Sequence, residues 1–226
     1  MPSSSGTLHV YIEHDGTPWI DRAHVSPDPT PRRPVALEWM AKDSGPRLWL
    51  GRPCYAHVAA AEPGCDPLVW THHRYSAEVV RSMIAALRGF LAAHPFHDVV
   101  LVGHSGGGTL AWLMAAQVAE TSAVVTVAAN LDIDLWARFH GYSLLAGSQN
   151  PALMPPLPAR IREVHYAGGR DRNVPPAVLE SFAAGHPAAR IVVISDYDHE
   201  CCWVARWPQL LTAAIGDPPT AVRSAH

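Results

Sequence analysis

The stretch that decides the fold runs from His97 to Met114 and reads HDVVLVGHSGGGTLAWLM. Residues 98–102 are an apolar, β-branched run typical of a buried strand, and after the glycines the apolar residues recur at helical spacing. Ser105 lies where the period changes. Gly103 and Gly107 flank it, and on so tight a turn side chains there would collide with the neighbouring strand and helix. The stretch therefore predicts a strand, a nucleophile elbow and a helix.

Two polar residues downstream complete the pattern around Ser105. Asp171 follows a predicted strand at residues 161–166, and His199 follows another at residues 190–195. In open α/β sheets the catalytic groups gather at the carboxyl ends of the strands. Serine, aspartate and histidine also occur here in the chain order of a hydrolase triad. A plain strand-to-helix turn with a solvated serine is the alternative interpretation.

The chain resembles the α/β-hydrolase family, and within it bacterial, envelope-associated esterases of poorly defined substrate. The elbow at residues 103–107, the acid loop at 168–175 and His199 carry the family likeness. The closer likeness rests on the segments VYIEHDG (10–16), GRPC (51–54), CDPLVWT (65–71) and DHECCW (198–203). The resemblance implies Ser105 as nucleophile, His199 as general base and Asp171 as the acid. Asp132, which follows an earlier strand, is the alternative acid.

Residues 14–17 follow the first predicted strand, where the family has its oxyanion loop. Acyl transfer places negative charge on the former carbonyl oxygen, and each backbone N–H aimed at it contributes about 3 kcal/mol. We expect one N–H from Gly106 and the other from Gly16 or Thr17. A type I′ hairpin at Asp15-Gly16 is the alternative, but the sequence after it is rich in proline and lacks a matching strand.

The remaining periodicity predicts an α/β fold. Helical patterns, such as the one at residues 76–93, alternate with strand-like segments, so we expect a mostly parallel sheet with helices on both faces. Two strands that the family has before its oxyanion loop are absent from this prediction. The expected organisation is one domain over residues 1–216, with a small cap at about 131–158 and a tail at 217–226. About six strands are predicted, at residues 8–13, 47–50, 98–103, 123–128, 161–166 and 190–195.

Composition excludes several classes of partner. The formal net charge is −3, Lys42 is the only lysine, and no basic tract predicts nucleic-acid binding. No apolar stretch is long enough for a membrane span. No phosphate-binding glycine loop and no metal-ligand spacing occur, so we expect neither a cofactor nor a metal. The expected partner is a small-molecule ester, and the oligomeric state stays open.

The cap carries aromatic residues at helical spacing. Trp136 and Phe139 are expected to bound a modest apolar pocket near Ser105, which favours short to medium acyl chains. A stripe packed against the core is the alternative.

Four cysteines are present. A Cys54–Cys65 disulfide would tie down the segment beside the oxyanion loop, with buried thiols as the alternative, and Cys201 and Cys202 are expected to be packed free thiols. Residues 1–6 contain no apolar signal sequence, which favours the cytoplasm. The resemblance and the cysteine pairing favour the periplasm or cell envelope instead.

These observations predict a serine hydrolase of carboxylic esters that works through an acyl-enzyme. A thioesterase or acyltransferase with the same triad is the first alternative. A binding module of the envelope that kept the fold without catalysis is the second.

Overall fold

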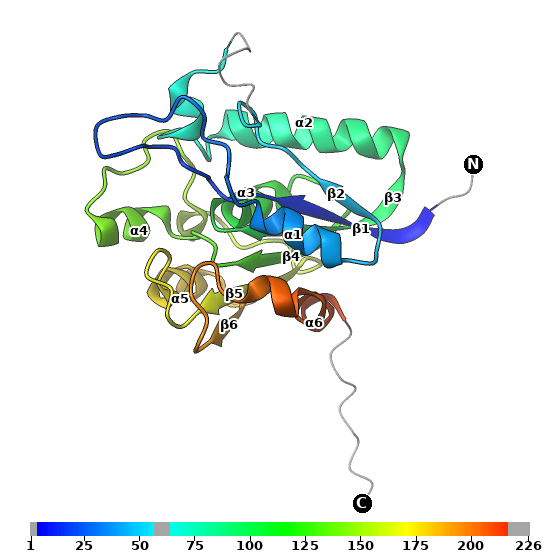
Figure 1. Cartoon of the computed structure of the whole chain (residues 1–226). Helices are drawn as coiled ribbons and strands as arrows, with labels where there is room; N and C mark the ends of the chain where they lie inside the picture. Colours follow the sequence, from blue (N-terminus) through cyan, green and yellow to red (C-terminus); the bar gives the residue numbers. More distant parts are fainter. Residues whose placement is uncertain (1–3, 57–63, 217–226) are drawn as a thin grey trace, which may run out of the picture.

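Six parallel strands form one sheet in the order β2-β1-β3-β4-β5-β6. The computed structural model describes residues 4–56 and 64–216 (Figure 1). Each predicted strand is confirmed, with ends within a few residues of those expected, and the fold class is confirmed with them. The predicted tail at 217–226 lies outside the described residues. The strands are β1 (Ser4–Ile12), β2 (Arg47–Trp49), β3 (Phe96–His104), β4 (Thr121–Val127), β5 (Arg162–Gly168) and β6 (Arg190–Ile194).

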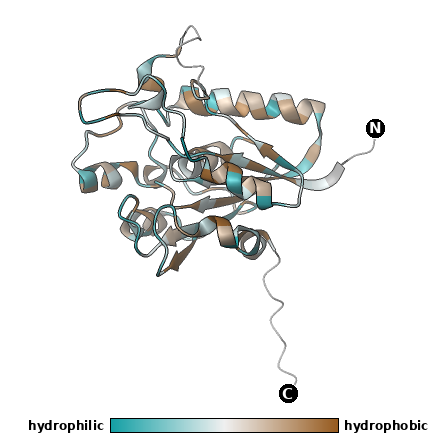
Figure 2. Cartoon of the chain, in the orientation of Figure 1, coloured by the Kyte–Doolittle hydropathy of each residue, from teal (hydrophilic) through white to brown (hydrophobic). Residues whose placement is uncertain are grey.

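Helices cover both faces of this sheet (Figure 1). One face packs against α2 (Ala77–Ala93), α3 (Gly106–Ala115) and α5 (Pro176–Gly185), and the other against α1 (Val35–Lys42) and α6 (Trp203–Ile215). A strand buried on both faces is apolar at every position, which explains the unbroken apolar run in β3. Figure 2 shows this hydrophobic character concentrated on the strands. The described residues include no helix long and apolar enough to cross a membrane.

Shorter elements connect the strands on the side where they end. The helix α4 (Ile133–His140) and the short 3₁₀ helix η2 (Pro151–Leu153) lie between β4 and β5, in the segment expected as a cap. Another 3₁₀ helix, η1 (Pro67–Trp70), precedes α2. The hydroxyl of Ser76 caps the start of α2 by accepting from the N–H of Val79.

The sheet topology places four polar segments at one edge. Because all six strands are parallel, their carboxyl ends meet there. β1 leads to Asp15, β3 to Ser105, β5 to Asp171 and β6 to His199. The fold therefore brings residues together that are up to 184 positions apart in sequence, as the numbers of Asp15 and His199 show.

Candidate active site

Ser105 lies on a strained turn between β3 and α3. Its backbone has φ 50° and ψ −122°, in a region that side chains other than glycine rarely adopt. Its N–H donates to the Val127 carbonyl at 2.9 Å, which ties the turn to β4. A Cβ on Gly103 would overlap the Gly107 backbone, and one on Gly107 would overlap the Ile12 carbonyl. Both glycines therefore satisfy the steric need that the sequence predicted.

His199 and Asp171 form a hydrogen-bonded pair. His199 Nδ1 lies 2.8 Å from Asp171 Oδ2, and the aspartate side chain is completely buried. The other carboxylate oxygen accepts from the N–H groups of Asn173 and Val174, each at 2.8 Å. These bonds fix the carboxylate, so that Nδ1 of the ring carries the donated proton and Nε2 is left as a base.

Ser105 and His199 line the same cavity, whose volume is about 860 Å³. Within the described chain no hydrogen bond joins the Ser105 hydroxyl to the histidine ring. Such bonds between nucleophile and base are often long without substrate and tighten when it binds. The cavity therefore brings Ser105 and His199, the expected nucleophile and base, to one surface.

Sequence reasoning missed His104, the residue before Ser105. It is completely buried, and its Nε2 lies 3.0 Å from the backbone carbonyl of His199. Burial lowers the pKa of His104 well below its ordinary value, with a further contribution from neighbouring His199. The ring is thus neutral at ordinary pH, and its Nε2–H donates to that carbonyl. His104 thus joins the turn at Ser105 to the loop that carries His199.

Asp132, the alternative acid, has other partners. Its carboxylate caps α4 by accepting from the Leu135 N–H, and it also accepts from Asn150 Nδ2 and the Ser181 hydroxyl. No bond to His199 occurs among the described residues, so the geometry favours Asp171 over Asp132 as the acid.

The oxyanion loop differs from the expectation in its donors. The Gly16 N–H donates to His14 Nδ1 at 3.0 Å, and the Thr17 N–H donates to the Pro29 carbonyl at 2.9 Å. Both groups are already paired because the loop folds back on itself, so the assignment to Gly16 or Thr17 is wrong. Within residues 4–56 and 64–216, the N–H groups of Asp15 and Gly106 have no partner. These two are the available backbone donors.

The Asp15 side chain forms an ion network that the sequence did not predict. Asp15 Oδ1 lies 2.5 Å from an Arg52 nitrogen, and Oδ2 lies 2.5 Å from the Tyr75 hydroxyl and 3.3 Å from an Arg74 nitrogen. Although burial raises the pKa of Asp15, the two guanidinium groups lower it well below its ordinary value overall. A Cβ on Gly106 would overlap this carboxylate, so the network packs directly against the residue after Ser105.

This network holds more positive than negative charge. Arg52 and Arg74 are both buried and share a single carboxylate. The phenols beside them stay neutral, because burial raises the pKa of Tyr55 to about 12 and that of Tyr75 well above its ordinary value. Among the described residues, two of the Arg52 nitrogens, Nε and Nη2, are buried without a hydrogen-bond partner. Counted over residues 4–56 and 64–216, the cluster therefore carries one more positive charge than negative.

A disulfide supports this network. Cys54 is joined to Cys65, with their Cα atoms 5.5 Å apart, in agreement with the predicted pairing. Cys54 lies between Arg52, which binds the Asp15 carboxylate, and Tyr55, whose hydroxyl donates to the Asp15 carbonyl at 3.0 Å.

The other two cysteines differ from the prediction. Cys201 and Cys202 are joined to each other and exposed, so the expectation of packed free thiols is wrong. They lie in the loop between His199 and α6, which begins at Trp203.

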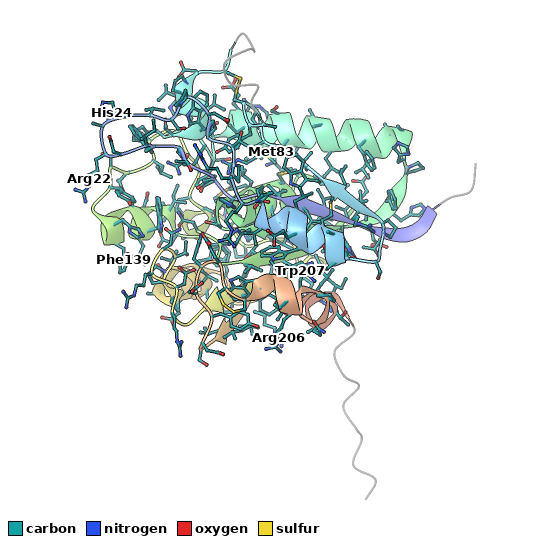
Figure 3. All side chains as sticks on the ribbon, in the orientation of Figure 1. Arg22, His24, Met83, Phe139, Arg206 and Trp207 are labelled. Carbon is teal, nitrogen blue, oxygen red and sulfur yellow. A yellow bond between two sulfur atoms is a disulfide. The ribbon has the colours of Figure 1, made fainter. Side chains whose placement is uncertain are left out.

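The cavity is larger and more polar than the modest apolar pocket that was predicted. Trp136 lines it, and the Trp136 indole N–H donates to the Asn173 carbonyl at 2.9 Å. Phe139 is not among the lining residues. It is 59% exposed, packs against His140, and lies at the margin of the molecule in Figure 3. The two aromatics are three residues apart on α4 and so lie near the same face, but only Trp136 reaches the cavity.

The described residues contain one group with metal-ligating atoms close together: Glu13, His14 and His104. Its donor atoms are largely in use. Glu13 accepts from the N–H groups that begin α1, and His14 Nδ1 accepts from Gly16 while Nε2 faces the Arg33 carbonyl at 3.1 Å. Through these bonds the group anchors the loop at residues 14–17.

Comparisons with known proteins agree with this architecture. A family model described as alpha/beta hydrolase fold matches residues 53–153. An alpha/beta hydrolase enzyme from the metagenome of lagoon sediments at Mar Chica, Morocco, is 17% identical with a TM-score of 0.54, over 92% of this chain and 90% of that one. A hydrolase of the same fold family from Bacillus anthracis is 10% identical with a TM-score of 0.57, over 94% and 93% of the two chains.

A puromycin-hydrolyzing peptidase from Mycobacterium tuberculosis is 14% identical with a TM-score of 0.64, over 98% of this chain but only 36% of that one. No curated protein sequence matches the chain. At these identities the likeness concerns the fold. Together with the family model, it identifies the chain as a protein of the α/β-hydrolase fold.

Proposed function

We propose that this protein hydrolyses carboxylic esters through an acyl-enzyme on Ser105. His199 Nε2 accepts the serine proton as Oγ attacks the ester carbonyl, and it returns that proton to the leaving alcohol. Water then attacks the acyl-enzyme with the same histidine as base, and the acid product leaves. Asp171 keeps the ring oriented and stabilises its positive charge.

The observation that carries the proposal is the position of the histidine and aspartate pair beside the strained serine. The His199 Nδ1 to Asp171 Oδ2 distance of 2.8 Å sets the tautomer, and the ring shares its cavity with Ser105. The developing oxyanion would be stabilised by the unpaired N–H groups of Gly106 and Asp15, with the start of α3 adding its dipole.

The same intermediate serves related reactions. Thioesters, amides and acyl acceptors other than water all pass through an acyl-serine, and the name of the mycobacterial structural relative refers to a peptidase. We place esters ahead of amides because an alcohol is an easier leaving group than an amine. Acyl chains of short to medium length come first because the cap beside the cavity is short. A binding module without catalysis is the candidate that the experiment must exclude.

The test is labelling by a fluorophosphonate probe combined with hydrolysis of p-nitrophenyl butyrate. Ser105→Ala should abolish labelling, and Ser105→Ala and His199→Ala should each lower kcat by about 10⁴-fold to 10⁶-fold. Ser143→Ala is the matched control, because Ser143 lines the same cavity and has no place in the mechanism. Hydrolysis that persists in Ser105→Ala, or no labelling of the native protein, would refute the proposal.

A further inference from the structure

The cavity around Ser105 has an excess of positive charge, although the chain as a whole has a formal net charge of −3. Four of its lining residues are arginines, and three are acidic. A like excess of one, three arginines against two acidic residues, occurs in an adjoining hollow of about 600 Å³. It shares Arg33, Asn173, His199 and Glu200 with the cavity and adds Arg170, Arg172 and Asp198 among its charged residues. The arginines of the cavity itself are Arg22, Arg32, Arg33 and Arg74.

Two of the three acidic lining residues are paired with arginines. Glu200 lies 2.9 Å from an Arg33 nitrogen, and Asp15 is shared between its two buried arginines. Asp21 keeps its negative charge and accepts from the backbone and the ring of His24. Arg22 and Arg32 form no ion pair within the described parts of the chain. Two unpaired arginines against one exposed carboxylate leave the free charge of the cavity lining positive.

One of the lining arginines, Arg74, is buried. Arg74 lines the cavity with a side chain that is only 6% exposed, and with Arg52 it outnumbers the single Asp15 carboxylate. An uncompensated buried cation is costly, and an anion within the cavity would offset that cost. Because Asp15 packs against Gly106, this charge lies next to the reacting serine.

The cavity also has apolar lining residues. Trp136, Leu145 and Val174 line it from the cap and from the loop after Asp171, and Trp19 and Ile20 line it from the loop that carries Arg22. The cavity thus offers contacts to an apolar group as well as to a carboxylate or phosphate, which arginine binds through paired hydrogen bonds.

We propose that the substrate is an amphiphilic ester, with an apolar group on one side of the scissile bond and an anionic group on the other. The anion binds to three arginines of the cavity lining: Arg22, Arg32 and Arg74. This inference rests on the proposed ester hydrolysis and names the substrate class for the same site.

The first experiment compares butyryl esters of four small alcohols: ethanol, choline, glycolate and 2-hydroxyethyl phosphate. We expect kcat/KM for the anionic esters to exceed that for the ethyl ester by about 10-fold or more at low salt, with the choline ester poorest. The better of the two anionic esters tells whether a carboxylate or a phosphate is preferred. A comparison of kcat/KM for p-nitrophenyl hydrogen glutarate and p-nitrophenyl butyrate tests the same preference for an anion in the acyl group.

The second experiment uses Arg22→Gln/Arg32→Gln and the control Arg206→Gln. Arg206 is exposed on α6, away from Arg22 in Figure 3, and does not line the cavity. The double variant should lower the ratio of anionic to neutral kcat/KM by about fivefold or more, whereas the control should keep the native ratio. Raising the salt from about 0.01 M to about 0.15 M should weaken the preference in the native protein.

The affinity for the esters can be measured separately from turnover in a variant without the proposed nucleophile. Ser105→Ala should bind the anionic butyryl esters more tightly than the ethyl ester in calorimetry. Equal kcat/KM for neutral and anionic esters, or a double variant with the native ratio, would overturn this inference and leave the ester hydrolase intact. No hydrolysis of any ester would instead overturn the proposed function.

Discussion

Two carboxylates near Ser105, the fully buried Asp171 and the mostly buried Asp15, differ in how they are held. Asp171 is bound by two backbone N–H groups of its own loop and by His199, 28 positions away. Asp15 is held by side chains 37, 59 and 60 positions away: Arg52, Arg74 and Tyr75. The first carboxylate orients the proposed base, and the second fixes the loop that faces the proposed oxyanion.

Asp171 is therefore held mainly by local contacts, and Asp15 by contacts with residues distant in sequence. The backbone bonds to Asp171 form within its own turn. The position of Asp171 and His199 therefore depends only on the ends of β5 and β6, which precede them. The Asp15 side depends on three separate segments and a disulfide, so changes far from the cavity reach it. Substitutions should therefore affect mainly turnover on the Asp171 side, and both stability and turnover on the Asp15 side.

The largest expected effect is that of Asp171→Asn. An amide there lets the imidazole adopt the wrong tautomer, and kcat should fall by about 10⁴-fold while the melting temperature changes little. Asp132→Asn is the control, because Asp132 caps α4 and does not contact the base. If Asp132→Asn lost turnover and Asp171→Asn kept it, the acid would come from the end of β4.

Asp15→Asn should lower the free energy of unfolding by about 3 kcal/mol, because it leaves two buried guanidinium groups without an anion. We also expect a lower kcat for neutral esters, since the loop that carries the Asp15 N–H loses its anchors. Denaturant unfolding and steady-state kinetics measure the two effects. Asp98→Asn, at an exposed position on β3 that does not line the cavity, should change neither. Native stability in Asp15→Asn would show that the ion network contributes nothing.

Cys54→Ala/Cys65→Ala should lower the free energy of unfolding by about 2 to 3 kcal/mol, mainly by releasing the unfolded chain. It should also reduce kcat, because Arg52 and Tyr55 flank Cys54 and both bind Asp15. Thiol counting in the native protein under non-reducing conditions checks that the bridge exists. A variant that lost stability but kept full kcat would separate the disulfide from the oxyanion loop.

The pH dependence of stability follows from the depressed pKa of Asp15. A carboxyl whose pKa is lower in the folded state contributes its stabilisation fully above the unfolded value of about 3.9, and loses it as pH falls toward the folded value. The stability difference between native protein and Asp15→Asn should therefore be constant near pH 6 and shrink below about pH 4. Urea unfolding at several pH values measures it, and a difference that grew in acid would contradict the assignment.

Trp136→Ala should have the smallest effect, a change of up to about 10-fold in the preference between butyrate and palmitate esters. Trp136 lines the cavity and Phe139 does not, so Phe139→Ala is the matched control. Trp136→Phe tests the indole bond to the Asn173 carbonyl while keeping most of the bulk. An unchanged preference with a lower melting temperature would show that Trp136 only packs the cap against the acid loop.

The sequence by itself determined the strands, the turn at Ser105 and the order of the three residues in the proposed triad. These features depend on local rules: side-chain periodicity, the steric need for glycine beside the elbow, and polar residues directly after apolar strands. The parallel sheet then follows from the alternation of strands and helices.

Only the tertiary structure decided the surroundings of that turn. Neither the ion pairs of Asp15 with Arg52 and Arg74 nor the bond from His104 to the His199 loop has a signal in local spacing. Whether Gly16 or Thr17 keeps a free N–H depends on how the loop folds back onto Pro29. Each of these contacts joins segments whose separation is set by the sheet order, so a local pattern in the sequence does not specify them.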